Sequence, residues 1–399
     1  MKKTVMILGA SILQLPAIIK AKEMGLNVVV VDMNPNAIGF RESGIIKEII
    51  STIDIPNVLI AAKKHEIDGI LTICSDMPMR TVAAVAKELN LIGISEETAL
   101  KATNKYEMRK ALQNNAVPIP KFYRISTFDE LKDKIKFFSE TIILKPADNS
   151  GSRGIVRIDD LNNIDNLFNS YQYCVSNSRN GDILVEEYMY GDEISVETMS
   201  FKGECKVIQI TDKLTTGAPH YVEMGHSQPS KFVNSDLYKD ICKIAIEANK
   251  AVGITNGPSH TEIMVTNNGP KIVEIGARLG GDFITTDLVP LSTGIDMVEN
   301  VLKISLGLTP NLNVKYNKGS AIRYFSQKKG ILKNIYNIDI AKSIDGIKKI
   351  NFIYNYGDEI QEITDSSKRI GFVIAQNDDA EQAINSCKKA VDTIKIVIE

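Results

Sequence analysis

The sequence has no tryptophan, only four histidines and five cysteines, and almost no excess of charge of either sign. The cysteines are odd in number and far apart, so they form neither a disulfide framework nor a zinc-binding motif. A net charge of -2 offers no basic surface to nucleic acid or to anionic lipid. No uninterrupted apolar run reaches the roughly 18 residues that a membrane-spanning helix needs. These absences favour a cytoplasmic protein whose partners include neither nucleic acid nor a membrane.

The first residues resemble the start of a secretory signal, because Lys2 and Lys3 precede an apolar stretch. Gly9 and Pro16 interrupt that stretch, and no cleavage site of small residues follows it. We therefore expect a strand, a helix and a second strand here instead of a signal peptide.

A dinucleotide site on such a unit needs three glycines, which keep the turn tight and let the backbone approach a pyrophosphate. Only Gly9 is present, because Ser11 and Gln14 occupy the other two positions. Asp32 does stand where an acid would meet the ribose. Because the fingerprint is mostly missing, an NAD-dependent oxidoreductase is disfavoured and the unit is interpreted as structural.

A chain of 399 residues exceeds the about 250 to 300 residues that one core serves, so several units are expected. In 1–94, apolar strands alternate with helical stretches, which predicts a small parallel sheet covered by helices. The next units are 95–190 and a longer mixed region, 191–308. The last, 309–399, is rich in strands and closes with an amphipathic helix from Ala380. The pattern predicts an α/β protein.

The second region begins with helix and continues as a compact unit. Ser95 precedes two acids, a favourable helix start, and the helical stretch runs to about Asn115. Pro118 and Pro120 then require an extended linker. From 122 to 188 the apolar pattern alternates between strands and helices, which predicts a two-layer unit.

The segment IILKPADNSGSRGIVRI contains the first chemical signal. Lys145 ends an apolar strand, and a loop with Ser150, Gly151, Ser152 and Gly154 follows. Small residues let backbone N–H groups turn inward around an anion, the serines add hydroxyl donors, and the lysine adds a positive charge. The segment returns to a strand and lacks the Walker ending, so a phosphate-binding loop and an ordinary polar hairpin both stay open.

The segment DILVEEYMYGDEISVE contains the second signal. An apolar strand ends in Glu186 and Glu187, a linker with Gly191 follows, and Glu193 opens a new strand. A hinge of this kind would present backbone donors and acceptors to a purine edge, while a carboxylate accepts from ribose hydroxyls. The alternative is a solvated strand end, where acids are common.

The segment HTEIMVTNNGPKIVEIGAR predicts a hairpin with two facing acids. Gly269 suits the left-handed position of a three-residue turn. If Thr266 pairs with Pro270, the antiparallel register places Glu262 directly opposite Glu274. Two facing carboxylates on an otherwise apolar hairpin repel each other, so something must neutralise them.

A divalent cation would neutralise the two glutamates, and hard oxygen ligands of this kind suit Mg²⁺ or Mn²⁺ better than zinc. Arg278 follows on the same side and would balance anionic groups that the metal holds. In the alternatives, the hairpin slips in register and both acids face water, or Arg278 and a lysine pair with them.

The ordered set of these residues resembles the ATP-grasp superfamily. The set consists of Lys105, Lys145 with its glycine–serine loop, the EEYMYGDE hinge, Glu262, Glu274 and Arg278. Within the superfamily, GPSHTEIMV, EIGARLGGD and GSAIRYFSQKKGIL are most similar to the L-amino acid ligases, the bacilysin-type dipeptide synthetases.

The resemblance implies an ATP-grasp fold of four parts. These are a Rossmann-like pre-ATP-grasp domain (1–94), linker helices with an α+β lid subdomain (95–190), a mixed-sheet catalytic subdomain (191–308) and a small C-terminal α/β subdomain (309–399).

The resemblance also implies which residues bind the nucleotide. Lys105 and Lys145 would contact the phosphates of ATP, and the loop from Ser150 to Gly154 would close over them. Adenine would bind to Glu186, Glu187 and the backbone of Met189, and the ribose to Glu193.

For the metal and the substrates, the resemblance implies that Glu262 and Glu274 bind Mg²⁺, with Mn²⁺ as a substitute. Arg278 would hold the carboxylate substrate and then its acyl phosphate, and His226 corresponds to a histidine of the substrate pocket. Many ATP-grasp enzymes have asparagine two residues after the second metal glutamate, whereas this chain has Gly276. The number of metal ions, two or fewer, therefore stays open.

The implied reaction is ATP-dependent joining of a carboxylate to an amine through an acyl phosphate, with an amino acid as the activated acid. The partners would be small-molecule carboxylate and amine substrates, and a homodimer is an option. The alternatives are activation of bicarbonate or formate by the same fold, and a regulatory protein that binds nucleotide without catalysis.

Overall fold

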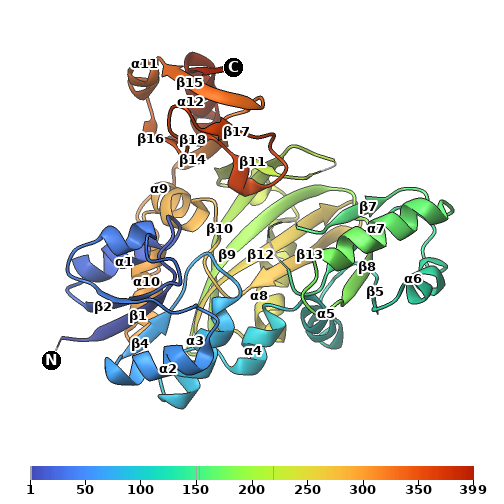
Figure 1. Ribbon diagram of the computed structural model, residues 1–399, viewed down its shortest axis with the longest axis horizontal. Helices are drawn as coiled ribbons and strands as arrows, with labels where there is room; N and C mark the ends of the chain where they lie inside the picture. Colours follow the sequence, from blue (N-terminus) through green and yellow to red (C-terminus); the bar gives the residue numbers. More distant parts are fainter. Residues whose placement is uncertain (1, 150, 152, 219) are drawn as a thin grey trace.

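The computed structural model describes residues 2–149, 151, 153–218 and 220–399, in which the chain forms four sheets with helices packed against them. Figure 1 shows the N-terminal sheet at the lower left, a second small sheet at the right, a large sheet between them and the C-terminal region at the top. No helix in these ranges is long and apolar enough to span a bilayer.

The N-terminal unit is a parallel sheet in the order β3-β2-β1-β4, with buried strand centres. Its elements are β1 (Thr4–Leu8), α1 (Leu15–Glu23), β2 (Asn27–Val31), η1 (Ile38–Arg41), β3 (Ile46–Glu48), α2 (Ile55–Lys64), β4 (Gly69–Leu71) and α3 (Pro78–Glu88). The predicted parallel sheet is confirmed, because β1 pairs in parallel with β2 and α1 connects the two strands.

The turn after β1 is filled by its own side chains. Asp32 accepts a hydrogen bond from the backbone N–H of Ala10 at 2.7 Å. Gln14 is buried, bonds to the backbone of Ile73, and lies where a Cβ on Gly9 would meet it at 2.8 Å. The acid and the glutamine therefore stabilise the turn, which agrees with the structural interpretation of this unit.

The helical stretch expected from Ser95 to Asn115 is two helices, α4 (Glu96–Lys101) and α5 (Lys105–Asn114). The prediction of one continuous helical stretch was wrong. The side chain of Asn104 accepts hydrogen bonds from the backbone N–H groups of Tyr106 and Glu107 and so begins a second helix. This second cap places Lys105 at the first turn of α5.

The second small sheet, which we call the lid sheet, is antiparallel in the order β5-β8-β6-β7. Its elements are β5 (Phe122–Ile125), α6 (Phe128–Ile135), β6 (Ile142–Pro146), β7 (Val156–Ile158), α7 (Ile164–Ser176) and β8 (Ile183–Glu187). Apolar side chains of α6 and α7 form one core with the strands, so the predicted two-layer unit is confirmed.

The large sheet has the order β13-β12-β9-β10-β11-β14-β18-β16. Its first part contains β9 (Asp192–Phe201), β10 (Glu204–Thr215), β11 (Glu223–Gln228), η2 (Lys231–Asn234), α8 (Tyr238–Val252), β12 (Gly257–Thr266) and β13 (Gly269–Gly276). After β13 come η3 (Ile284–Leu288), α9 (Val289–Thr293) and α10 (Met297–Ser305). Helix α8 packs on β13, β12, β10 and β9, and α10 contacts α1 and β4, so α10 joins this region to the N-terminal unit.

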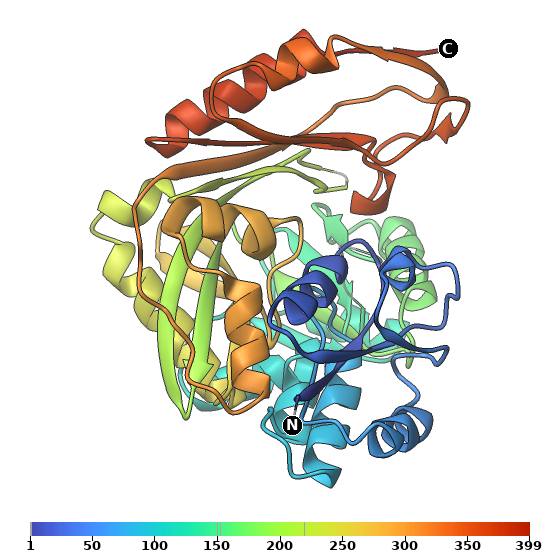
Figure 2. The same ribbon diagram turned by 90° about the vertical axis from the view of Figure 1, so that its left-hand side faces the viewer.

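The C-terminal region extends the large sheet, because β14 pairs with β11 (Figure 2). Its elements are β14 (Gly319–Tyr324), β15 (Gly330–Tyr336), α11 (Ile338–Lys342), β16 (Ile347–Phe352), β17 (Glu359–Ile360), η4 (Ser366–Lys368), β18 (Gly371–Asn377), α12 (Ala380–Thr393) and β19 (Lys395–Ile398). A second sheet, β17-β15-β19, and α12 enclose a separate core. The division of the chain at 94, 190 and 308 stays a prediction.

The hairpin of β12 and β13 brings Glu262 opposite Glu274, as predicted. The predicted turn is wrong by one residue, because Thr266 pairs with Gly269 and not with Pro270. A β-bulge at Val273 inserts one extra residue between the turn and Glu274 and restores the expected pairing. The bulge therefore decides that both carboxylates share one face of the sheet.

Candidate active site

A cavity of about 530 Å³ lies where the N-terminal unit, the lid sheet, the large sheet and the C-terminal region meet. Its walls come from the loops after β1 and β4, from β6 and β8, from the large sheet and from residues 364–366. We call the wall from β6 and β8 the lid side, and the wall that includes 364–366 the C-terminal side. A concave site of this size, lined by convergent polar groups, fits a small-molecule substrate and a nucleotide.

Most residues selected from the sequence line this cavity. They are Lys105, Lys145, Gly151, Glu186, Glu187, Met189, Glu193, His226, Glu262, Glu274 and Arg278. Gly154 does not line it: at φ +79° it packs so closely that a Cβ would meet Asn177 at 2.6 Å and Pro146 at 2.7 Å. Ser150 and Ser152 lie outside the described residues.

Each of the two facing glutamates is neutralised by a lysine. Glu262 Oε1 lies 2.9 Å from Lys213 Nζ, and Glu274 Oε1 lies 2.8 Å from Lys105 Nζ. Burial by itself would raise the pKa of Glu262, but Lys213 and His260 hold it well below its ordinary value. Each carboxylate is therefore neutralised by its own lysine, and at least Glu262 stays ionised.

The carboxylates of Glu262 and Glu274 suit a magnesium ion that water and phosphate oxygens also bind. Among the described residues, no three His, Cys, Asp or Glu side chains converge as a closed metal cage. Two carboxylates on one face leave the remaining positions to water and phosphate oxygens, an arrangement that Mg²⁺ prefers. Gly276 offers no third ligand, and a Cβ there would lie 3.2 Å from Asp76 Oδ1.

Lys213 on β10 is one cation that the sequence analysis did not select. Its Nζ lies 2.6 Å from Glu193 Oε1, 2.9 Å from Glu262 Oε1 and 3.7 Å from Glu223 Oε1. These acids raise the pKa of Lys213 well above its ordinary value, although burial opposes the shift. Burial and the neighbouring acid Glu262 in turn raise the pKa of Glu193, despite Lys213. One buried ammonium group thus joins β9, β11 and β12.

On the lid side, Lys145 and Glu186 belong to a buried ion triad. Arg109 of α5 donates to both oxygens of Glu186, at 2.7 and 3.1 Å, and Lys145 Nζ lies 2.7 Å from Glu186 Oε2. Burial lowers the pKa of Lys145 to about 8, and although burial opposes it, the two cations lower the pKa of Glu186 to about 2. The carboxylate of Glu186 is fully engaged, and its main chain pairs with Phe122 of β5 and Ile143 of β6.

Arg109 also donates to the main-chain carbonyls of Ile272 at 3.1 Å and Val273 at 2.8 Å. Val273 is the bulged residue that sets the position of Glu274. One arginine without solvent exposure therefore ties α5 to the lid sheet and to the bulge. A signal for it exists in the sequence, since Lys105, Met108, Arg109 and Leu112 share the helical spacing of a buried face.

The hinge after β8 is held by aromatic and ionic contacts. Glu187 pairs with Lys271 of β13. The guanidinium of Arg157 lies 4.4 Å from the ring centroid of Tyr188, whose hydroxyl is 3.4 Å from that of Tyr221. These contacts join the lid sheet to β13 and to the loop before β11.

Arg278 pairs with an acid of the N-terminal unit. Its Nε and Nη2 lie 2.8 and 3.3 Å from the two oxygens of Asp76, in the loop after β4. Burial opposes the shift, but Arg278 holds the pKa of Asp76 below its ordinary value. The N-terminal unit therefore contributes a charged group to the cavity. Arg278 and Asp76 are too far apart in the sequence for their contact to be predicted from it.

On the C-terminal side, His226 of β11 is buried, and its Nε2 lies 3.4 Å from Asp282 Oδ2. Asp282 also receives two hydrogen bonds from Arg369, at 2.7 and 2.6 Å. Although burial opposes it, these donors hold the pKa of Asp282 well below its ordinary range. Sequence reasoning selected His226 but neither of its two supports.

A second histidine supports the glutamate pair. His260 of β12 contacts the buried Glu197 of β9, at 2.6 Å between Nδ1 and Oε1. Its Nε2 lies 3.7 Å from Glu262 Oε1. Burial lowers the pKa of His260, but the adjacent acids outweigh it and raise the pKa to about 9. His260 therefore links the buried Glu197 to Glu262.

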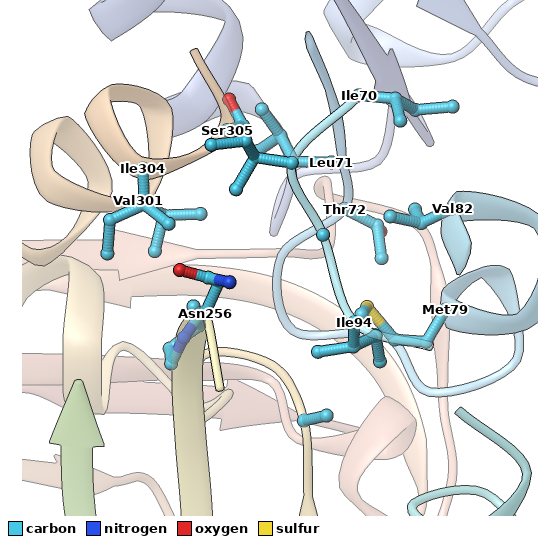
Figure 3. A pocket seen from close by; sticks show the side chains of 15 residues that line it. Ile70, Leu71, Thr72, Met79, Val82, Ile94, Asn256, Val301, Ile304 and Ser305 are labelled. Carbon is cyan, nitrogen blue, oxygen red and sulfur yellow. The ribbon is translucent and has the colours of Figure 1, made fainter. Parts of the chain in front are cut away.

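A smaller cavity of about 40 Å³ lies between the N-terminal unit and the large sheet, lined mostly by apolar side chains such as Ile70, Val82 and Ile304 (Figure 3). Its volume has room for one or two water molecules. It therefore does not compete with the large cavity as a substrate site.

Two family models match the chain. The ATP-grasp domain matches residues 138–287, and the L-amino acid ligase C-terminal domain 2 matches residues 323–399. The match to the ATP-grasp domain and the superposition on a solved structure confirm the predicted ATP-grasp fold. The match to the C-terminal domain confirms the predicted resemblance to the L-amino acid ligases.

The relatives agree with this assignment. The L-arginine-specific L-amino acid ligase of Bacillus subtilis is 28% identical over 278 residues, which are 68% of this chain and 66% of that protein. The alanine–anticapsin ligase of B. subtilis strain 168 is 25% identical over 59% of this chain and 53% of its own length. The matched part therefore spans less than two thirds of these curated relatives.

A crystal structure of an L-amino acid ligase from Bacillus licheniformis superposes with a TM-score of 0.85 at 22% identity. The superposition covers 100% of this chain and 99% of that one. The shared fold thus includes the C-terminal region.

Proposed function

We propose that this protein is an ATP-dependent carboxylate–amine ligase that joins an amino acid to an amine and releases ADP and phosphate. One observation carries the proposal: a single cavity holds the facing pair Glu262 and Glu274, the lysines Lys105 and Lys145, and the residues Arg278 and His226. The named activities of the relatives, which are L-amino acid ligases and an alanine–anticapsin ligase, support it.

In the first step, a carboxylate oxygen attacks the γ-phosphorus of ATP, ADP leaves and an acyl phosphate forms. Lys105 and Lys145 line the cavity beside the hinge and would bind the phosphates as point charges. The hinge from Glu186 to Met189 would bind adenine, and Glu193 would bind the ribose. Gly151 lies in the loop that would cover the phosphates and keep water away from the acyl phosphate.

The facing acids of the hairpin support a divalent cation. Glu262 and Glu274 are paired with Lys213 and Lys105. A triphosphate that drew Lys105 to its phosphates would leave Glu274 without its cation. Glu262 and Glu274 would hold Mg²⁺ or Mn²⁺, which would neutralise charge on the transferring phosphoryl group.

In the second step, the amine nitrogen attacks the acyl carbon, the carbon–oxygen bond to phosphate breaks, and a proton leaves the nitrogen. Arg278 lines the cavity with a planar fork suited to a carboxylate and then to an acyl phosphate. His226 would orient the incoming amine. The homodimer and the cytoplasmic location stay predictions.

The test is a phosphate-release screen with ATP, Mg²⁺ and pairs of amino acids and amines, followed by mass measurement of the product. We expect phosphate release to require both substrates and the product mass to equal their sum minus water. Stimulation by bicarbonate or formate alone would instead support the alternative activation reaction. Nucleotide binding without turnover for any pair would support a regulatory protein.

A further inference from the structure

Arg369 of the C-terminal region lies beside the cavity and contacts three separate segments. It follows η4 and is buried, with 6% of its surface exposed. Nη1 and Nη2 bind the two oxygens of Asp282 at 2.7 and 2.6 Å, and Nη1 also donates to the carbonyl of Glu223 at 2.9 Å. Nε donates to the carbonyl of Ser366 at 2.9 Å. The guanidinium therefore joins the loop after β13, strand β11 and the C-terminal loop.

The guanidinium is also held from one face, because it lies 3.7 Å from the ring centroid of Tyr324 on β14. Stacking and two-pronged binding together fix both the plane and the rotation of the group. A lysine could not reproduce this arrangement, because it offers a point charge and no plane.

The segment that Arg369 binds is conformationally strained. Asp282 and Phe283 both have positive φ angles, +52° and +62°, which side chains other than glycine rarely adopt. Two successive residues in this region persist only where surrounding contacts determine them. The ion pair with Arg369 and the packing of Phe283 on Phe372, at 4.3 Å between ring centroids, supply those contacts.

Asp282 connects Arg369 to His226, because one of its oxygens contacts both side chains. Oδ2 of Asp282 receives Arg369 Nη1 and lies 3.4 Å from His226 Nε2. A carboxylate beside Nε2 favours the proton on that nitrogen and leaves Nδ1 as an acceptor. Nδ1 of His226 is buried and has no hydrogen-bond partner within the described part of the chain. His226 therefore lines the cavity with Nε2 beside Asp282 and with Nδ1 unpaired among the described residues.

We propose that Arg369 is a positioning residue for the amine step: it holds Asp282, and through Asp282 it orients His226, so that the C-terminal region completes the substrate end of the cavity. The inference rests on the proposed ligase function. It explains why residues 364–366, which Arg369 binds through Ser366, line the cavity although they belong to the C-terminal region.

The kinetic test compares Arg369→Met, Arg369→Lys and a matched control, Lys349→Met. Lys349 pairs with Asp287 of η3 at 3.3 Å, so it also joins the C-terminal region to the segment after β13, and it does not line the cavity. We expect Arg369→Met to lower kcat for amide formation at least tenfold and to lower the amide formed per ADP, with the KM for ATP within twofold. Arg369→Lys should show a smaller loss, and Lys349→Met should stay within twofold in every constant.

A spectroscopic test needs no substrate. Nitrogen-15 NMR of the four histidines, assigned with His226→Gln, should show the proton of His226 on Nε2 in the unaltered protein and in Lys349→Met. In Arg369→Met and Arg369→Lys we expect this preference to weaken.

Two results would overturn the inference: an unchanged proton position in the folded Arg369 variants, or equal kinetic losses in Arg369→Met and Lys349→Met. If Arg369→Met does not fold, as judged by thermal melting, Arg369→Lys decides in the same way. Failure of the screen to find any substrate pair would refute the proposed function but would leave the NMR result to decide the role of Arg369.

Discussion

The buried triad of Arg109, Glu186 and Lys145 should be among the largest single contributions to stability near the cavity. Arg109→Met keeps much of the side-chain length but removes two hydrogen bonds to Glu186 and two to main-chain carbonyls of β13. It leaves a buried carboxylate with one cation. Removing one partner of a buried ion pair costs about 3 to 5 kcal/mol, and we expect a loss of that size in the free energy of unfolding.

The same variant should change how stability depends on pH. The pKa of Glu186 is lowered from 4.5 to about 2 in the folded protein, so its stabilising effect is complete above pH 4.5 and is lost as the pH falls toward 2. A shift of this size corresponds to about 3 kcal/mol. Without Arg109 the pKa of Glu186 is lowered less. The difference in the free energy of unfolding between the unaltered protein and Arg109→Met should therefore become smaller in acid.

The assay is urea denaturation at pH 7 and at steps down to pH 3. The matched control is Arg124→Met, which removes an exposed arginine paired with Asp182 in the same lid sheet, 2.8 Å away. Exposed pairs contribute less than about 1 kcal/mol, so this control should stay close to the unaltered protein. A loss below 1 kcal/mol in Arg109→Met, or the same difference at pH 7 and pH 3, would refute the reasoning.

Three further variants test the cavity. Glu274→Gln should lower ATP-dependent phosphate release about 100-fold or more, while Glu204→Gln, an exposed residue on the same sheet, should leave it unchanged; equal rates in all three proteins would contradict the metal assignment. Asp76→Asn removes the acid that competes for Arg278, so the KM for the carboxylate substrate should fall several-fold, and a rise would contradict competition. Lys213→Met leaves adjacent acids without their shared cation, so Mg²⁺ should raise its melting temperature more than that of the unaltered protein; an equal rise would count against a metal at these acids.

The strands and the hairpin could be predicted because their signals are local. Alternating apolar residues mark β12 and β13, and the facing of Glu262 and Glu274 follows from counting along them. The count succeeded although the turn is one residue shorter, since the bulge at Val273 compensates. Bulges leave no periodic mark in a sequence, so this agreement depended on the two local deviations cancelling.

The supporting groups could not be predicted because their partners are distant in the chain. Arg278 meets Asp76 across about 200 residues, and Asp282 meets Arg369 across 87. Periodicity reports which face of an element is buried, but it does not say which charged groups meet there. Motifs therefore predicted residues that would touch substrate, and only the structure showed which residues hold them in place.

The pairing of Lys105 with Glu274 would make metal and nucleotide binding interdependent. At 2.8 Å, the lysine that would bind a phosphate neutralises the carboxylate that would bind the metal. Metal binding to Glu274 would therefore free Lys105 for the phosphates, and by linkage a phosphate on Lys105 would free Glu274 for the metal. In Glu274→Gln the lysine loses its charged partner, so metal-free ADP should bind several-fold more tightly to the variant than to the unaltered protein in calorimetry. Weaker binding of metal-free ADP would mean that Glu274 positions Lys105 for the nucleotide and does not compete for it.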